Sequence, residues 1–153
     1  MKKTIIAVAS FGGHWIQLLR LAKVLSGKYD IHYISTNESA SQMVAESVYY
    51  NVKDFNRNNP FKIFSVTWKI FCILRQVKPV AVITTGAAPG LVAVSVAKVL
   101  GIKTIWVDSV ANAAQLSGSG KIASKFVDFP ITQWENVSTK KVKFFGNVFG
   151  NLH

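Results

Sequence analysis

Short apolar runs recur along the chain, and segments with helical spacing of their apolar positions lie between most of them. The runs are rich in β-branched and aromatic residues and show little alternation, which is typical of strands covered on both faces of a parallel sheet. Strands are predicted over residues 4–9, 31–35, 48–52, 80–85, 103–107, 129–132 and 142–145. Helices are predicted over residues 14–26, 40–47, 60–77, 91–100 and 120–126. This order predicts an α/β fold with a doubly wound, Rossmann-like parallel sheet.

The pattern runs through the chain without a break between domains. Its 153 residues contain no repeat, low-complexity segment or linker-like stretch, so residues 1–153 are expected to form a single domain. Lys2 and Lys3 precede the first apolar run, as in a signal peptide, but a glycine turn and a helical pattern follow it. A buried first strand is therefore expected.

Three of the predicted strands are followed by small or polar residues. These segments are residues 10–14 (SFGGH), 84–90 (TTGAAPG) and 108–112 (DSVAN). In doubly wound sheets, ligands bind at the carboxyl ends of the strands, near the point where the strand order reverses. The three segments are therefore expected to converge on one cleft.

The first segment joins a strand to a helix. Ser10, Gly12 and Gly13 allow a ligand to approach the backbone closely, and the start of the helix supplies free N–H groups that favour an anion such as phosphate. His14 stands at the mouth of this helix, where it could act as a general base, a phosphate ligand or a structural cap. The alternative for the whole segment is an ordinary turn with a capping serine.

The second segment, residues 84–90, also joins a strand to a helix through small residues. Thr85, Gly86 and Ala87 leave room for a ligand beside another helix start, although tight packing of helix on strand would explain the same small residues.

The third segment begins with a carboxylate. The sequence has seven Asp and Glu residues, and only Asp108 directly ends an apolar strand. Partial burial would suit Asp108 to general-base work or to binding a sugar hydroxyl, and the alternative is a helix cap. Asn112 could bind a ligand or close the turn. We expect His14 and Asp108 to face one cleft from adjacent strand ends.

The charge indicates an anionic partner. Eighteen Lys and Arg residues against seven Asp and Glu residues give a net charge of +11, which suits nucleic acid, anionic lipid or a phosphorylated substrate. The basic residues are scattered and no nucleic-acid-binding motif accompanies them, so nucleic acid is not expected as a partner.

A single cysteine suits a reducing cytoplasm, and the sequence predicts neither a metal site nor a cofactor.

The helix predicted at residues 60–77 has more apolar surface than one face of a sheet covers. It is too short and too charged to span a bilayer, but it could lie in the membrane interface with its basic residues near anionic headgroups. The alternative is a crossover helix that is fully covered. The residues expected to contact the membrane are Phe61, Lys62, Phe64, Trp68, Lys69, Phe71 and Arg75.

Taken together, these motifs resemble the oligosaccharide-biosynthesis glycosyltransferase subunit family, which includes the membrane-anchoring subunit of the dolichol-pathway N-acetylglucosaminyltransferase and bacterial counterparts in capsule and exopolysaccharide synthesis. The resemblance extends over nearly the whole chain. It rests on the three strand-end segments, on residues 116–121 (LSGSGK) and on Gln133 and Trp134. A more distant resemblance, which includes Gly146 and Asn147, is to the acceptor-binding half of MurG-type enzymes.

The resemblance implies the N-terminal half of an inverting GT-B glycosyltransferase that is divided between two chains. This chain would bind the membrane and a polyprenyl-diphosphate-linked saccharide acceptor, and a separate subunit would bind the nucleotide sugar. It would lie in the cytoplasm, on the inner face of the plasma membrane. Eukaryotic members have an N-terminal membrane anchor that this sequence lacks, so residues 60–78 are expected to make the membrane contact.

Two other functions are compatible with parts of the pattern. A non-catalytic membrane scaffold that recruits a partner glycosyltransferase would need neither His14 nor Asp108 for chemistry. A stand-alone nucleotide-binding protein of the flavodoxin type is disfavoured, because Thr36 and Asn37 follow the second strand where an acidic ribose ligand is expected.

Overall fold

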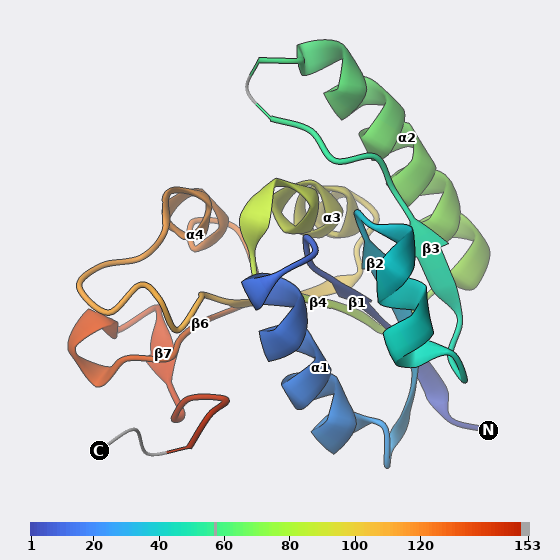
Figure 1. Cartoon of the computed structure of the whole chain (residues 1–153). Coiled ribbons are helices and arrows are strands. Elements are labelled where there is room, and N and C mark those ends of the chain that lie inside the picture. The colour runs from blue at the N-terminus through green and yellow to red at the C-terminus, as the bar shows by residue number, and fades with distance from the viewer. Residues whose placement is uncertain (57, 151–153) are drawn as a thin grey trace.

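Seven parallel strands form one open sheet in the order β3-β2-β1-β4-β5-β6-β7 (Figure 1). The computed structural model describes residues 1–56 and 58–150. The strand order reverses between β1 and β4, which is the switch point of a doubly wound sheet. The strands are β1 (Lys3–Val8), β2 (Tyr29–Ser35), β3 (Tyr49–Asn51), β4 (Ala81–Thr84), β5 (Lys103–Val107), β6 (Phe129–Thr132) and β7 (Lys143–Phe144).

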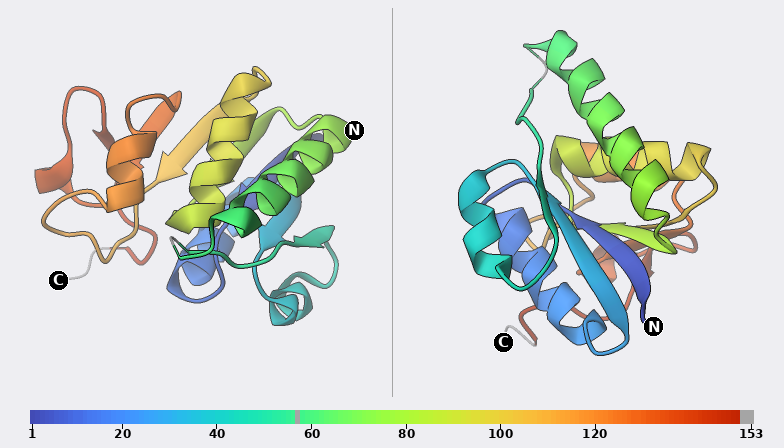
Figure 2. Two further views of the ribbon diagram at one scale, coloured as in Figure 1. Left: turned by 90° about the horizontal axis from the view of Figure 1, so that it is seen from above. Right: turned by 90° about the vertical axis from the view of Figure 1, so that its right-hand side faces the viewer.

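Helices cover both faces of this sheet. One face carries α2, α3 and α4, and the other carries α1 and the 3₁₀ helix η1 (Figures 1 and 2). A second 3₁₀ helix, η2, follows β6. The helices are α1 (Gly13–Leu25), η1 (Glu38–Val44), α2 (Pro60–Val77), α3 (Ala87–Val99), α4 (Gly118–Ala123) and η2 (Glu135–Val137).

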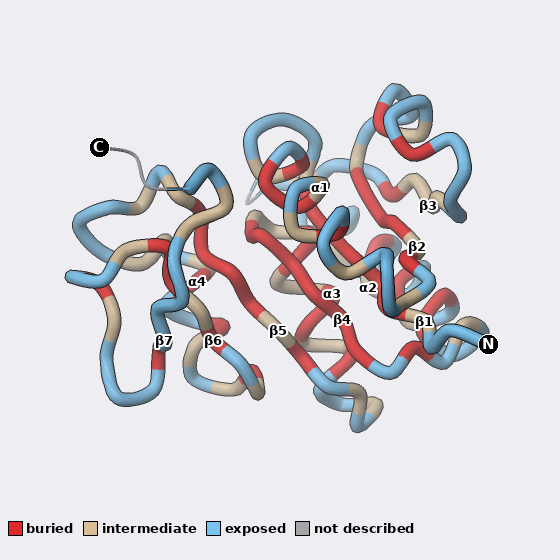
Figure 3. Tube along the Cα trace, turned by 90° about the horizontal axis from the view of Figure 1, so that it is seen from below, coloured by how far each residue is buried: buried red, intermediate tan, exposed pale blue. Residues whose placement is uncertain are grey.

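The core has two layers because successive strand residues point to opposite faces. Ile6 and Val8 of β1 pack with residues of α2 and α3, whereas Ile5 and Ala7 pack with residues of α1. The central strands are buried along almost their whole length, as Figure 3 shows. Burial on both faces explains why the sequence pattern of these strands is continuous rather than alternating.

The predicted strands all coincide with observed strands, and the fold class is confirmed. Three helix predictions need correction. The helix predicted at residues 40–47 is the 3₁₀ helix η1, the one predicted at 91–100 begins at Ala87, and the one predicted at 120–126 is α4, which ends at Ala123. Pro89 does not delay the start of α3, because a proline in the first turn has no intrahelical hydrogen bond to lose.

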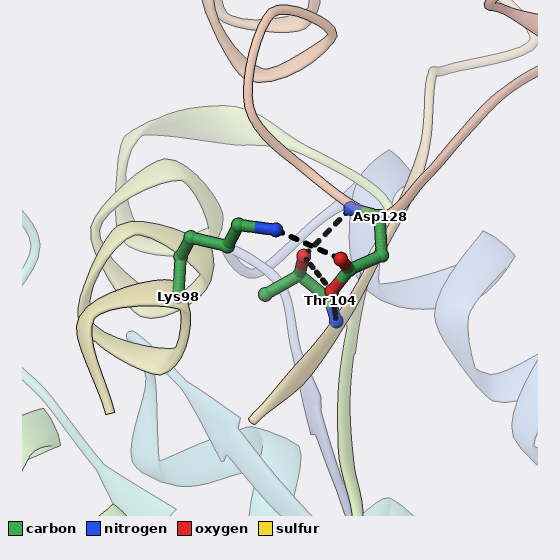
Figure 4. A network of polar contacts seen from close by, with 3 residues as sticks. All are labelled: Lys98, Thr104 and Asp128. Atoms are coloured by element: carbon green, nitrogen blue, oxygen red, sulfur yellow. Dashed lines mark hydrogen bonds and ion pairs between the residues drawn. The ribbon is translucent and has the colours of Figure 1, made fainter. Parts of the chain in front are cut away.

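A polar cluster joins β5 to β6 at the amino edge of the sheet (Figure 4). The Asp128 carboxylate accepts hydrogen bonds from Lys98 Nζ at 2.8 Å, from Thr104 N at 2.9 Å and from Thr104 Oγ1 at 3.0 Å. Asp128 N donates in return to Thr104 Oγ1 at 2.9 Å. The hydrogen bond from Lys98 lowers the pKa of Asp128 most, the bonds from Thr104 lower it further, and together they outweigh burial, which raises it.

We expect Asp128→Asn to destabilise the protein at pH 7 by about 1 to 2 kcal/mol, because it removes a charged acceptor from this cluster. The lowered pKa means that the stabilisation is complete above the usual carboxyl pKa and is lost as pH falls through the folded-state pKa. Urea denaturation at pH 7 and in acid should therefore show the difference from wild type shrinking in acid. Glu46→Gln at an exposed position is the control, and an equal loss in both variants would contradict the assignment.

Candidate functional site

The loops after β1 and β4 are tied together through His14. The Thr85 carbonyl oxygen lies 2.9 Å from His14 Nδ1, and Thr85 Oγ1 donates to the His14 carbonyl oxygen at 2.6 Å. Because a carbonyl oxygen only accepts, Nδ1 is the nitrogen that carries the proton. In the neutral imidazole this leaves the lone pair on Nε2, so the ring is held in the tautomer that can accept a proton there.

Gly86 provides the space for the His14 ring. A Cβ atom at Gly86 would lie 3.2 Å from both Cε1 and Nδ1 of His14, closer than most Cβ contacts allow. Gly86 also has a φ of 120°, and Ala87 follows with a φ of 65° in the left-handed region that favours glycine. A non-glycine residue held in this region is a mark of local strain, and such strain is concentrated at functional sites.

A cleft of about 400 Å³ lies at this edge of the sheet. It is formed by the loops that follow β1, β4 and β5 and by the first turn of α4. Its lining combines one imidazole with hydroxyl, amide and small side chains, so it offers hydrogen bonds in the manner of a site for a polar ligand. The lining residues are His14, Ala87, Ser109, Ala111, Asn112, Ser117, Gly118 and Ser119.

The two long helices that begin at this edge favour an anion. Each of α1 and α3 has 13 residues, and a glycine, Gly12 or Gly86, precedes the first helical turn. Within the described residues, no side chain caps either start. The first N–H groups of a helix lack intrahelical partners and carry the positive end of its dipole, so this edge of the sheet attracts negative charge.

Asp108 organises the loop that forms one wall of the cleft. Asp108 is 1% exposed, and its carboxylate accepts hydrogen bonds from four donors in the described chain. Trp106 Nε1 at 3.0 Å and Ser117 Oγ at 2.6 Å donate to Oδ1, and Ser117 N at 2.8 Å and Asn112 Nδ2 at 3.2 Å donate to Oδ2. The carboxylate thereby fixes Asn112 and Ser117, which line the cleft, while its own oxygens are occupied.

Two buried glutamines connect this loop to the rest of the site. Gln17 of α1 donates to Ser109 Oγ at 3.0 Å and accepts from Val110 N at 3.0 Å. Gln133, which follows β6, donates to Gln17 Oε1 at 2.7 Å and to the Asp108 carbonyl oxygen at 2.8 Å. The network therefore holds the cleft loop against the same helix that presents His14.

The structure brings together part of the predicted site. His14, Ala87 and Asn112 line the cleft, and Thr85 and Gly86 position the imidazole. Ser10, Gly12, Gly13 and the Asp108 side chain are not among the lining residues of the described chain. The prediction that His14 and Asp108 come from adjacent strand ends is wrong, because β4 lies between β1 and β5.

Sequence reasoning missed several residues of the site. Ser109, Ser117 and Ser119 line the cleft, and Gln17 and Gln133 support it. Gln17 could have been found, since it is a polar residue on the buried side of α1, three positions after His14. The serines lie in a loop or at the start of α4, where serine is common for many reasons. The resemblance included the segments that hold them, but residue type alone did not mark these serines as lining a cleft.

The predicted membrane-contacting helix is α2, and its aromatic residues are exposed except Phe71, which is half-buried. Phe61, Phe64 and Trp68 are 82%, 73% and 66% exposed, while Val66, Ile70, Ile73 and Leu74 on the other side are buried. Lys62, Lys69 and Arg75 are exposed on the same helix, and Lys69 Nζ donates to the Asn51 carbonyl oxygen. In residues 1–56 and 58–150, no helix combines the length and the apolar character needed to cross a membrane.

In comparisons with known sequences, a family model and individual proteins agree on one family. The family model described as "Oligosaccharide biosynthesis protein Alg14 like" matches residues 50–148. The human UDP-N-acetylglucosamine transferase subunit ALG14 is 28% identical over 171 residues, covering 92% of this chain and 79% of that protein. The rat protein of the same name is 26% identical over 171 residues, with 91% and 79% covered.

Comparison with solved structures shows the same fold in larger proteins. MurG from Acinetobacter baumannii superposes with a TM-score of 0.80 at 19% identity, covering 95% of this chain and 46% of that one. UDP-GlcNAc 2-epimerase from Methanocaldococcus jannaschii superposes with a TM-score of 0.73 at 16% identity, covering 94% and 45%. The chain thus spans a little under half of each of these structures, and at this identity the likeness concerns the fold alone.

The packing around Asp108 can be tested with two glycines of α4. A Cβ atom at Gly120 would overlap Asp108 Oδ1 and lie 2.9 Å from Ser117 Oγ, whereas one at Gly118 would meet nothing within 4 Å. We expect Gly120→Ala to destabilise the protein by about 1 to 3 kcal/mol, and Gly118→Ala to be neutral or slightly stabilising. Urea denaturation measures both effects. Equal stability of the two variants would contradict the role assigned to Asp108.

Proposed function

This chain belongs to the Alg14-like family of oligosaccharide biosynthesis proteins, and on that premise we propose that it is the acceptor- and membrane-binding subunit of a two-component glycosyltransferase. A partner subunit binds the nucleotide sugar. The pair, an inverting enzyme of the GT-B type, transfers the sugar to a polyprenyl-diphosphate-linked saccharide. The bacterial context of this reaction is capsule or exopolysaccharide synthesis.

The observation that carries the proposal is the cleft at the switch point. The starts of two helices favour an anion there, and His14 stands between them with the lone pair of its neutral form on Nε2. A diphosphate suits the helix starts, and a sugar hydroxyl suits the imidazole. The serine and asparagine side chains of the cleft would contact the remaining hydroxyl groups of the acceptor.

In this proposal His14 is the general base. Its Nε2 takes the proton from the acceptor hydroxyl as that oxygen bonds to the anomeric carbon of the donor sugar. The bond between that carbon and the nucleoside diphosphate breaks at the same time, and the leaving group keeps the electron pair. Attack from the side opposite the leaving group inverts the anomeric centre.

Asp108 acts through other residues rather than on the acceptor. Its oxygens are taken by donors from Trp106, Asn112 and Ser117, so a proton from the acceptor has no free site on it. It is therefore proposed as a positioning residue. Of the two sequence-based candidates for the base, the geometry supports His14.

The acceptor diphosphate is assigned to the loops after β1 and β4. The residues Ser10, Gly12 and Gly13 lead into α1, and Thr85, Gly86 and Ala87 lead into α3. Both helix starts reach the cleft, through His14 and Ala87, and Asn112 lines it from the third loop. A backbone site of this kind binds an anion without needing a lysine or arginine.

The membrane assignment rests on α2. Its exposed aromatic residues and its exposed basic residues Lys62 and Arg75 combine the two features that hold a helix in the membrane interface. The net charge of +11 adds attraction to anionic headgroups. The proposed location is peripheral, on the cytoplasmic side of the plasma membrane, where polyprenyl-diphosphate acceptors are presented.

We expect no sugar transfer by this chain alone and robust transfer when it is combined with its donor-binding partner. In the complex, His14→Ala should lower kcat by about 100-fold or more, because it removes the general base. Asp108→Asn should instead raise the KM for the acceptor, because it loosens the loop that holds it. Steady-state assays on a polyprenyl-diphosphate-linked sugar measure both.

His32→Ala is the matched control for the histidine, because His32 lies in β2 and pairs with Asp30. Partner binding, followed by co-purification, should be unchanged in all three variants. Full activity of the His14→Ala complex would support the non-catalytic scaffold, and transfer by the chain alone would rule out the divided enzyme.

We expect Phe61→Glu combined with Trp68→Glu to release the protein from vesicles containing anionic lipid, because it places charge on the apolar face of α2. Added salt should weaken binding of the wild type, since the basic residues contribute electrostatically. Vesicle co-sedimentation measures both effects.

Val24→Glu combined with Phe145→Glu is the control for this test. Val24 and Phe145 are exposed apolar residues that line one pocket beside α1, on the other face of the sheet, and the charge change is identical. Equal release by both pairs would show that net charge, rather than the aromatic face of α2, determines binding.

A further inference from the structure

Helix α3 has an apolar outer side that covering the sheet does not explain. From Ala87 to Ala97, Ser95 is the only residue with a polar side chain. Ala93, Val94 and Ala97 are buried against the sheet, Leu91, Val92 and Val96 pack against the same core but stay half-buried, and Val99 is 86% exposed. A surface helix normally has polar residues on its outer side. The outer side of α3 therefore has the composition of a surface that contacts something apolar.

An apolar groove of about 430 Å³ runs between this side of α3 and helix α2. Phe64, Trp68 and Phe71 form the α2 wall, and the rings of Trp68 and Phe71 stack with their centroids 5.5 Å apart. Val96 and Val99 form the α3 wall. The two helices lie next to each other on one face of the sheet (Figure 2).

The hydroxyl groups of the groove have no proton left to donate to an occupant. Its two hydroxyl-bearing residues are Thr67 and Ser95. Thr67 Oγ1 donates to the Ile63 carbonyl oxygen at 2.7 Å, and Ser95 Oγ donates to the Leu91 carbonyl oxygen at 2.7 Å. Both hydroxyls are thus bonded within their own helices, and no charged residue of the described chain lines the groove. An occupant without polar groups suits such a lining.

Helix α3 connects the groove to the polar cleft. Ala87 lines the cleft, Ser95 and Val99 line the groove, and Leu91 lies between them. These four residues follow each other at intervals of four, so they form one ridge along the helix. At the helical rise, Ala87 and Ser95 are about 12 Å apart. A site for an anion and a site for an apolar chain therefore lie at the two ends of one uncharged ridge.

We propose that the groove between α2 and α3 binds the first isoprene units of the acceptor lipid while its diphosphate occupies the cleft. This inference rests on the function proposed above and assigns a second subsite to its acceptor. An amphiphile with a diphosphate at one end and a hydrocarbon chain at the other matches the order of the two sites along α3. Part of the chain is then held by protein rather than by the bilayer.

Farnesyl diphosphate, used below its micelle concentration and without membranes, tests this binding by isothermal titration calorimetry on the full chain. Inorganic diphosphate is the probe for the polar end alone. We expect farnesyl diphosphate to bind more tightly than inorganic diphosphate. Ser95→Trp, which fills the groove, should weaken farnesyl diphosphate binding by at least about tenfold, because excluding two methylene groups loses about that factor. It should leave binding of inorganic diphosphate unchanged.

Val99→Glu is the second variant, because an exposed position leaves the core intact if Ser95→Trp fails to fold. It should also weaken farnesyl diphosphate binding. Val24→Glu and Val24→Trp at an exposed position of α1, outside the groove, are the matched controls and should bind like wild type.

The outcomes separate the two proposals. If inorganic diphosphate binds and the farnesyl chain adds no affinity, or if the groove variants bind like wild type, the groove assignment is wrong and the proposed function stands. Equal weakening by Val24→Glu would likewise overturn the assignment, because it would point to the added negative charge rather than to the groove. If neither diphosphate binds, both the groove assignment and the diphosphate acceptor of the proposed function are wrong.

Discussion

The need to satisfy a buried carboxylate organises the candidate site. A charge that is removed from water is tolerated only with hydrogen-bond partners, and Asp108 at the end of β5 finds them in Trp106, Asn112 and Ser117. These bonds tie the loop after β5 and the start of α4 to the end of the strand, and Gly120 leaves the space that the carboxylate needs. The wall of the cleft that Asn112 and Ser117 form therefore depends on the Asp108 carboxylate.

The fold could be predicted from the sequence because burial on both faces leaves a strong signal. All seven strands were evident as continuous apolar runs, and the strand-end rule placed three loops at one edge. Helix boundaries were less accurate where capping and proline chemistry compete, as at the start of α3. The 3₁₀ geometry of η1 was not predicted, because its apolar spacing over so short a segment resembles that of an α-helix.

The candidate site could be predicted only in part. His14 was identified because a histidine at a helix start after a glycine turn is unusual, and the structure places it in the cleft. Asp108 was singled out as a carboxylate that ends a core strand, but the sequence could not show how many donors surround it. Those donors come from loop residues such as Ser117, whose distance from Asp108 depends on the fold of the chain between them.

The cluster of Lys98, Thr104 and Asp128 lies at the amino edge of the sheet, opposite the cleft. The side-chain hydrogen bonds that hold β5 to β6 therefore lie at the edge of the sheet where no ligand is expected. Side chains that line the cleft but take no part in the Asp108 network, such as Ser119, can therefore change without loss of these bonds. In evolutionary terms, such a separation lets substitutions at the cleft change what it binds while the stability of the sheet is kept.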